Sequence, residues 1–221
     1  MSLRAVFFDL DGTLFDTAED LGAALNHVLM LNDMPSIPQN HIRHVVSDGA
    51  AALIKLGFDF GPEHPRYAVI RQQLLDFYLQ NTSQYTQLFP GMRELLEKLK
   101  ENGICWGIAT NKPWAYTDAL MRAFTFPEEP VCVICPDDVI NSKPAPDSLL
   151  LACKKAQCSP NEALYIGDHI RDIECGNNAA MQTIAAGYGY IKQDDDYACW
   201  PADYFIAHPN DIWPIIQQHI L

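Results

Sequence analysis

Short apolar runs alternate with amphipathic segments along most of this chain. The apolar run at 5–8 predicts a strand that is covered on both faces, and Gly12 marks a turn beyond its end. Further strands are predicted at 104–109, 131–135, 163–166, 182–186 and 203–206, and helices at 114–124, 146–156, 170–179 and from about 210. Strands and helices in this order are typical of a parallel sheet built from βαβ units.

A block of helices interrupts this alternation near the N-terminus. Apolar residues recur at helical spacing in consecutive segments with no strand between them, at 17–31, 42–56 and 67–79. Such a block is most simply an inserted unit. We therefore predict an α/β fold in which residues 1–15 and 86–221 form a Rossmann-like, doubly wound parallel sheet with its helices, and residues 16–85 form a helical cap inserted after the first strand.

The composition fits a folded α/β protein and narrows its partners. The 221 residues are 48% hydrophobic, which is enough for a packed core, and the formal net charge is −13. Because so acidic a chain is repelled by nucleic acid, we expect no nucleic-acid partner. No apolar stretch has the length of a membrane span, no signal-peptide pattern begins the chain, and the 7 cysteines are scattered among apolar segments. We expect a cytoplasmic protein with reduced thiols and no membrane partner, and the sequence does not predict its oligomeric state.

Two carboxylates, Asp9 and Asp11, follow the first predicted strand. Residues two apart in an extended chain share a face, and the carboxyl ends of parallel strands line the ligand crevice of open α/β sheets. Carboxylates that close together share a proton or hold a cation. Oxygen ligands with no neighbouring His or Cys suit a hard ion, so we predict Mg²⁺ here, although an ordinary acidic turn would have the same letters.

Further polar groups follow other predicted strands and would reach the same edge of the sheet. Thr110 and Asn111 come directly after the strand at 104–109. A hydroxyl and the backbone amides of a strand-to-helix turn can donate hydrogen bonds to phosphate oxygens. A helix N-cap is an equally good interpretation of Thr110.

Lys143 lies in a loop that two prolines stiffen, so its ammonium can be held in one direction against a phosphate. The alternative is a solvated loop lysine. Asp168 and Asp172 follow the strand at 163–166, and their spacing places them on one face of a starting helix. Asp168 is therefore a candidate metal ligand that Asp172 supports, and an acidic first helical turn is the alternative for Asp172.

Together these segments resemble the haloacid dehalogenase superfamily of phosphatases with a helical cap inserted after the first motif. The motifs stand in order as DLDGTL at Asp9, ATNK at Thr110, SKPAPD at Lys143 and GDHIRD at Asp168. Each is a weak signal by itself, whereas the four in order at strand ends are a strong one. Within the superfamily the chain is most similar to the phosphoglycolate phosphatases and to the N-acetylmuramic acid 6-phosphate phosphatases.

The resemblance implies Mg²⁺-dependent hydrolysis of a small phosphorylated metabolite. Asp9 would attack the phosphorus and form an aspartyl-phosphate, while Asp11 would act first as an acid and then as a base. Mg²⁺ would be bound by Asp9, Asp168 and the backbone carbonyl of Asp11. Lys143 and Thr110 would stabilise charge on the equatorial oxygens of the phosphoryl group.

Substrate contacts are expected from the core and from the cap. On the core side we expect Gly12, Thr13 and Asn111 to bind the substrate. On the cap side, Arg43 could hold a carboxylate or a sugar hydroxyl, and Gly49 permits a close backbone approach. A solvated helix surface is an equally good interpretation of this cap segment, which is marked by Arg43, Ser47, Asp48, Gly49 and Lys55.

Two other functions share parts of this pattern. A sugar phosphomutase of the same superfamily would have all the motifs, and it would keep the phosphoryl group on the enzyme until a sugar phosphate reorients in the site. A phospho-accepting receiver domain also gathers carboxylates, Thr and Lys around Mg²⁺, but its acidic pair precedes the phosphorylated Asp on a different strand and it has no helical insert. The order of the motifs therefore disfavours a receiver domain, and it does not distinguish a phosphatase from a phosphomutase.

Overall fold

The computed structural model describes residues 3–192 and 194–220. Its centre is a six-stranded parallel sheet in the order β5-β4-β1-β6-β7-β8, which confirms the predicted fold class. The strands are β1 (Ala5–Phe8), β4 (Cys105–Ala109), β5 (Val133–Ile134), β6 (Ala163–Gly167), β7 (Gln182–Ala186) and β8 (Tyr204–Ile206). β1 lies between β4 and β6, at the point where the strand order reverses and a doubly wound sheet opens its crevice.

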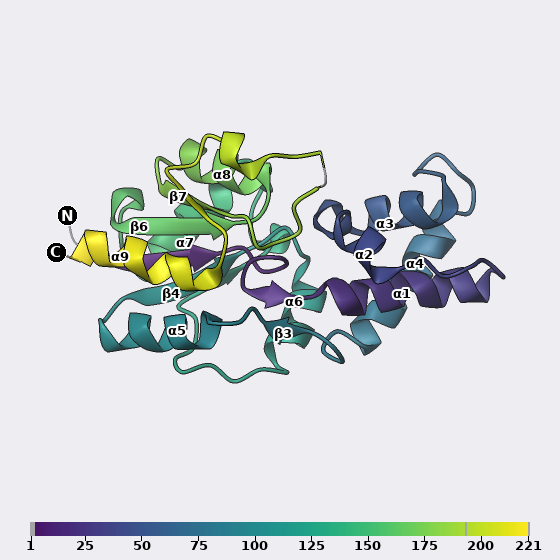
Figure 1. The fold of residues 1–221 in the computed structure, drawn as a ribbon, viewed down its shortest axis with the longest axis horizontal. Coiled ribbons are helices and arrows are strands. Elements are labelled where there is room, and N and C mark those ends of the chain that lie inside the picture. Colours follow the sequence, from purple (N-terminus) through teal and green to yellow (C-terminus); the bar gives the residue numbers. More distant parts are fainter. Residues whose placement is uncertain (1–2, 193, 221) are drawn as a thin grey trace.

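Helices cover the sheet and extend beyond one end of it (Figure 1). Those of the core are α5 (Met92–Glu101), α6 (Trp114–Met121), α7 (Asp147–Ala156), α8 (Ile170–Asn178) and α9 (Ile212–Ile220). Those that lie together beyond the carboxyl end of β1 are α1 (Ala18–Leu31), α2 (Gln39–Arg43), α3 (Gly49–Phe58) and α4 (Tyr67–Gln80). A short antiparallel ribbon of β2 (Phe15–Asp16) and β3 (Gln87–Leu88) stands where the chain leaves the sheet and returns to it. We call α1–α4 the cap helices, and the domain boundaries at 16 and 85 stay a prediction.

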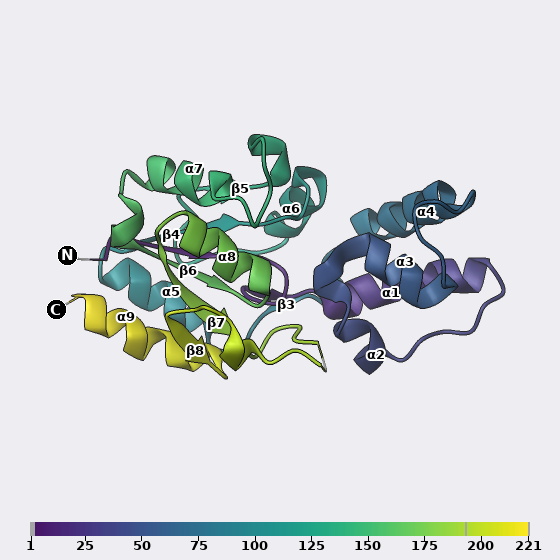
Figure 2. The ribbon, with the colours of Figure 1, turned by 90° about the horizontal axis from the view of Figure 1, so that it is seen from above.

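The two faces of the central strand bind different helices because successive side chains of a strand point to opposite faces. Val6 and Phe8 belong to a buried cluster that includes apolar residues of α5 and α9. Ala5 and Phe7 belong to a second cluster with residues of α7 and α8. Figure 2 shows α7 and α9 on opposite sides of the sheet. β1 is therefore buried throughout, and its carboxyl end is held in a fixed place.

The single helix predicted at 42–56 is wrong. In the structure α2 ends at Arg43, a short 3-10 turn spans Val46–Asp48, and α3 begins at Gly49. Gly49 has a φ of 76°, which lies outside the right-handed helical region, so the chain turns at this residue. The break places the turn at 46–48 against the core.

α5 is absent from the predicted elements, although its sequence carries a clear apolar stripe. Leu95, Leu96 and Leu99 recur at helical spacing and are all buried. Within residues 3–192 and 194–220, no helix combines the length and the apolar character needed to cross a membrane.

Candidate active site

Three carboxylates meet at the carboxyl edge of the sheet. Asp9 follows β1, Asp168 follows β6, and Asp172 lies in the first turn of α8. Oxygens of the three lie within 4.8 Å of one another. The backbone N–H of Asp9 donates to the carbonyl of Ile166 at 2.8 Å, which continues the β1–β6 pairing to the point where both strands end. The parallel register therefore brings together the acids that the sequence placed at this edge.

The loop after β1 wraps around Asp168. Gly12 has a φ of 81°, and a Cβ there would lie 2.1 Å from Oδ2 of Asp168, so only glycine fits. Thr13 donates from Oγ1 to Oδ1 of Asp168 at 3.0 Å, and the N–H of Tyr190 donates to Oδ2 at 2.9 Å. Gly12 and Thr13 lie outside the pocket lining, and their contacts orient Asp168.

Lys143 is buried among acids and hydroxyls. Its ammonium lies 2.8 Å from Oδ1 of Asp9 and 2.7 Å from Oδ1 of Asp172, and the exposed fraction of the lysine side chain is 1%. It also donates to the hydroxyl of Tyr165 at 2.9 Å and to the carbonyl of Ala109 at 3.1 Å. Asp172 therefore acts on Lys143 directly, and the solvated-loop interpretation of Lys143 does not describe this structure.

Thr110 and Asn111 form the turn after β4. Oγ1 of Thr110 accepts a hydrogen bond from the N–H of Lys112 at 3.1 Å, which is a local capping contact. Asn111 holds the Lys143 loop, since its side-chain amide donates to the Lys143 carbonyl and its side-chain oxygen accepts from the Lys143 N–H, both at 3.1 Å. Both residues line the pocket, where the Thr110 hydroxyl hydrogen can reach a ligand.

Burial makes negative charge on the acid cluster costly. Burial, with the charges of Asp9 and Asp172, raises the pKa of Asp168 to about 8. Burial also raises the pKa of Asp9 to about 6, against the opposing charge of Lys143. Although burial opposes it, the charges of Asp172 and Asp9 raise the pKa of Lys143, so this lysine stays protonated. A divalent cation between Asp9 and Asp168 would offset the remaining cost.

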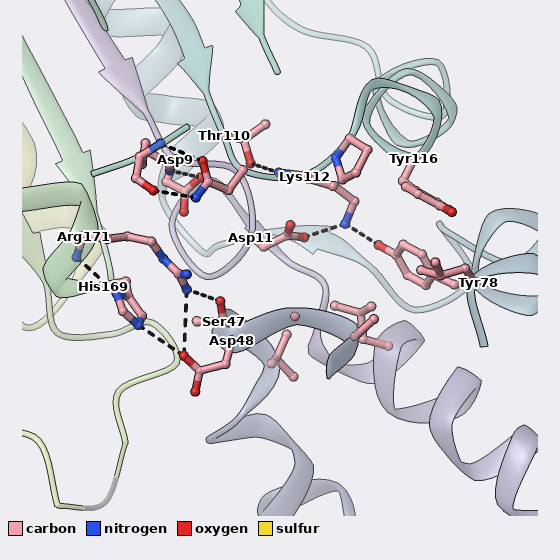
Figure 3. Close-up of a pocket in the computed structure, with 18 of the residues that line it drawn as sticks. Asp9, Asp11, Ser47, Asp48, Tyr78, Thr110, Lys112, Tyr116, His169 and Arg171 are labelled. Atoms are coloured by element: carbon pink, nitrogen blue, oxygen red, sulfur yellow. Dashed lines mark hydrogen bonds and ion pairs between the residues drawn. The ribbon is translucent and has the colours of Figure 1, made fainter. Parts of the chain in front are cut away.

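Asp11 belongs to a second network, whose members Lys112 and Tyr78 are not among the residues expected from the sequence. Its Oδ1 accepts from the ammonium of Lys112 at 2.8 Å and from Oγ1 of Thr17 at 2.6 Å. Lys112 also donates to the hydroxyl of Tyr78 on α4 at 2.6 Å (Figure 3). Lys112 comes two residues after Thr110, so its place after a predicted strand was a signal that could have identified it, whereas Tyr78 offered no such signal.

A pocket of about 310 Å³ opens above both networks, between the sheet edge and the cap helices (Figure 3). Asp9, Asp11 and Lys143 line its core side. The turn at 47–49 and a face of α4 line its cap side. Gly49 therefore lies at the crevice, as the sequence predicted for this segment, together with Ser47 and Asp48.

Ionic contacts hold the turn at 47–48 against the core. Asp48 lies 2.8 Å from the ammonium of Lys192, 3.4 Å from Nε2 of His169 and 4.0 Å from the guanidinium of Arg171. Arg171 also donates to the backbone carbonyl of Ser47. These contacts place the cap over the acid cluster.

Arg43 and Lys55, which the sequence placed at the crevice, lie outside the pocket lining. Arg43 ends α2 and forms an ion pair with Asp16 at 2.8 Å, with its guanidinium 4.8 Å from the ring centre of Tyr190. Lys55 is exposed and paired with Asp59 at 2.8 Å. Arg43 therefore faces the β2–β3 ribbon, where it lines a second hollow with Asp16, Gln87 and Leu88. The cationic cap residue in the pocket is instead Arg71 of α4.

Comparisons with known proteins agree with this geometry. Residues 6–186 match the model of the haloacid dehalogenase-like hydrolase family. The chain is 39% identical over 218 residues to the N-acetylmuramic acid 6-phosphate phosphatase of Pseudomonas putida, across 99% of this chain and 98% of that protein. It is 34% identical over 210 residues to the phosphoglycolate phosphatase of Xanthomonas campestris pv. campestris, across 95% of each.

The fold is shared with a crystal structure of a predicted phosphoglycolate phosphatase from Haemophilus somnus. The TM-score is 0.84 at 22% identity, across 97% of this chain and 98% of that one, and at this identity the likeness speaks for the fold alone. The family match and the two relatives confirm the resemblance drawn from the motifs. This chain belongs to the haloacid dehalogenase-like hydrolase family.

Proposed function

We propose that this hydrolase cleaves a small phosphomonoester with the help of Mg²⁺, and that Asp9 is its nucleophile. The observation that carries the proposal is the pair of Asp9 and Lys143, 2.8 Å apart on the floor of one pocket, with a carboxylate oxygen of Asp168 within 4.8 Å of one of Asp9. A phosphoryl group requires cations around its oxygens and a nucleophile in line with the leaving group, and these residues can supply both.

The acid cluster fits Mg²⁺ by its chemistry. Its donors are carboxylate oxygens without His or Cys, which suits a hard cation, and burial raises the pKa of Asp9 and of Asp168. Because both oxygens of Asp172 accept hydrogen bonds, from Lys143 and from the N–H of His169, we assign the ion to Asp9 and Asp168 and, as the resemblance implies, to the backbone carbonyl of Asp11. When bound, Mg²⁺ neutralises charge between the carboxylates and the phosphate.

The proposed reaction has two displacements at phosphorus. In the first, a carboxylate oxygen of Asp9 bonds to the phosphorus, the bond to the ester oxygen breaks, and Asp11 gives a proton to the departing alcohol. In the second, a water attacks the phosphorus of the aspartyl-phosphate and Asp11 accepts a proton from that water. The bond between the phosphorus and the Asp9 oxygen breaks, which frees inorganic phosphate and restores the Asp9 carboxylate. The ammonium of Lys112, 2.8 Å from Oδ1 of Asp11, holds the Asp11 side chain in place for both steps.

Lys143 and Thr110 are proposed to stabilise the phosphoryl oxygens. As the phosphoryl group arrives, one hydrogen of the Lys143 ammonium can turn from Asp9 to an equatorial oxygen, while Asp172 keeps the ammonium in place at 2.7 Å. The hydroxyl hydrogen of Thr110 can reach a second oxygen. Asn111 supports both because it fixes the Lys143 loop.

We also propose that the protein acts in the cytoplasm on a small phosphorylated metabolite. All seven cysteines are free, which fits a reducing compartment. Burial raises the pKa of Cys132 to about 12 and of Cys135 to about 11, so both thiols stay protonated and unreactive at neutral pH.

A phosphate-release screen tests the proposal. The purified chain, freed of metal with EDTA, is given a set of phosphomonoesters that includes 2-phosphoglycolate and N-acetylmuramic acid 6-phosphate, with and without Mg²⁺ and without any bisphosphate. We expect phosphate release that depends on Mg²⁺. If none of the esters releases phosphate, the proposed function is contradicted. Release that appears only after a sugar bisphosphate is added would favour a phosphomutase.

A further inference from the structure

The cationic residues of the pocket differ in how they are partnered. Most face a carboxylate that also lines the pocket, in the pairs Lys112–Asp11 at 2.8 Å, Lys143–Asp9 at 2.8 Å and Arg171–Asp48 at 4.0 Å. Arg71 is exposed, and among residues 3–192 and 194–220 no hydrogen bond or ion pair joins it to another residue. Arg71 is therefore a cation of the pocket that is available to a ligand.

Arg71 belongs to the wall that α4 presents to the pocket. Arg71, Leu75 and Tyr78 are spaced by four and three residues, so they lie along one face of the helix, and all three line the pocket. Tyr78 marks the end of this face near the reacting groups, because its hydroxyl contacts Lys112 at 2.6 Å. Arg71 lies seven residues earlier, about 10 Å along the helix axis from Tyr78.

This distance separates Arg71 from the phosphate subsite. The phosphoryl group belongs beside Asp9 and Lys143 on the floor, while the helix carries Arg71 away from that floor. A guanidinium binds a carboxylate through two parallel hydrogen bonds, and such a pair is stronger than a bond between neutral groups. The chain as a whole repels anions at its net charge of −13, so an unpaired arginine in the pocket gives a local place for a second anionic group of the substrate.

The space between the two subsites suits a ring. Leu75 lies between Arg71 and Tyr78 on the α4 wall, and Tyr116 of α6 lies 6.0 Å from Tyr78, ring centre to ring centre, on the core side. Aromatic and aliphatic side chains cover the apolar face of a sugar, and a volume of about 310 Å³ is within the range of small-molecule pockets. A two-carbon acid, whose phosphate and carboxylate are almost adjacent, is shorter than the ~10 Å of helix between Arg71 and Tyr78.

We infer that Arg71 binds a carboxylate on the alcohol portion of the substrate, and that the preferred substrate is the phosphate ester of a sugar acid. The inference rests on the proposed function and names the class of ester that the proposed site selects. Arg71 is a specificity-determining residue in this assignment, since it takes no part in the transfer of the phosphoryl group.

Matched pairs of esters test the inference. N-acetylmuramic acid 6-phosphate and N-acetylglucosamine 6-phosphate differ by the ether-linked carboxylate, and 2-phosphoglycolate and 2-hydroxyethyl phosphate form the corresponding short pair. The quantity measured is the ratio of kcat/KM for the acid to kcat/KM for the neutral ester, in wild type, R71Q and R71K. Arg66→Gln is the control, because Arg66 precedes the same helix and lies outside the pocket lining.

We expect the wild type to prefer the sugar acid over the neutral sugar, and R71Q to lower that ratio by about ten- to a hundredfold. R71K keeps the positive charge but loses the two parallel hydrogen bonds of the guanidinium, so it should lower the ratio less than R71Q does. R66Q should leave the ratio unchanged. The short pair should respond only weakly to R71Q.

The outcomes separate this inference from the proposed function. If R71Q slows the sugar acid and the neutral sugar by the same factor, Arg71 has only a structural role and the inference is overturned while the phosphatase stands. A larger effect on the short pair than on the sugar pair would overturn the sugar-acid assignment. If the wild type releases phosphate from none of the four esters in Mg²⁺, the proposed function fails and the inference fails with it.

Discussion

The floor of the pocket and its cap wall are built in opposite ways. On the floor, Lys143 is paired with Asp9 at 2.8 Å and with Asp172 at 2.7 Å before any substrate arrives. On the wall, Arg71 has no hydrogen-bond or ion-pair partner within residues 3–192 and 194–220. The groups proposed for chemistry are therefore held in place by each other, while the group proposed for substrate selection is left available for the ligand.

The strongest test of this contrast is Asp9→Asn. The side chain keeps its shape and its acceptor for the N–H of Leu10, which lies 2.7 Å from Oδ1, but it loses the nucleophilic oxygen. We expect kcat to fall by about 10⁴-fold or more, with a thermal midpoint no lower than that of wild type, because an ionisable group has been removed from a buried place. Asp59→Asn, on the exposed surface of the cap, is the control. Near-normal phosphate release by purified Asp9→Asn would show that another residue is the nucleophile.

Lys143→Met breaks the floor at its centre. It leaves Asp9 and Asp172 buried without their shared cation, so the free energy of unfolding should fall by about 3–5 kcal/mol. Urea unfolding followed by circular dichroism measures the loss. Lys55→Met is the matched control, since Lys55 pairs with Asp59 on the exposed surface and its loss should not be measurable. Equal midpoints for the two variants would mean that the buried pairing contributes little to stability.

Magnesium binding should strengthen as pH rises, because burial and neighbouring acids raise the pKa of Asp168 to about 8. Below that pH the ion must displace a proton, so its affinity should increase about tenfold per unit from pH 6 to 8 and level off above. The pKa of Asp9, about 6, makes the loss steeper below pH 6. Without the ion, the raised pKa of Asp168 means that folding loses stability as pH rises from about 4 through 8.

The measurement is the thermal shift that Mg²⁺ produces at each pH. The shift should grow from pH 6 to 8 in wild type and disappear in Asp168→Asn. A shift of equal size at every pH would contradict the assignment of Asp168 as a ligand that must be deprotonated.

The same contrast explains which residues sequence reasoning could find. Asp9, Thr110, Lys143 and Asp168 each follow a strand or lie in a loop at the edge of the sheet, and a parallel sheet brings strand ends together whatever the rest of the chain does. The predicted strands therefore indicate where Asp9, Thr110 and Asp168 lie, and the resemblance adds Lys143. The fold class followed for the same reason, because alternating strands and helices leave few arrangements.

The cap wall was harder because surface arginines on amphipathic helices look alike in sequence. The sequence indicates Arg43 and not Arg71, whereas in the structure Arg71 lines the pocket and Arg43 pairs with Asp16. How a helix is rotated over a site is decided by its packing against other helices, and one sequence does not reveal it. Lys112 belongs to the ATNK motif, two residues after Thr110, but the motif by itself does not indicate that its side chain reaches Asp11.

Tyr78→Phe probes the boundary between floor and wall. The change removes the hydroxyl that accepts from Lys112 at 2.6 Å and keeps the ring, which lies 4.6 Å from the ammonium. Lys112 would then be held by Asp11 and the ring, so we expect about 1 kcal/mol of lost stability and a several-fold lower kcat with little change in KM. Tyr67→Phe, at the start of the same helix and outside the pocket lining, should change neither. If KM rises while kcat stays the same, Tyr78 contacts the substrate, as proposed for Arg71, and does not position Lys112 for the reaction.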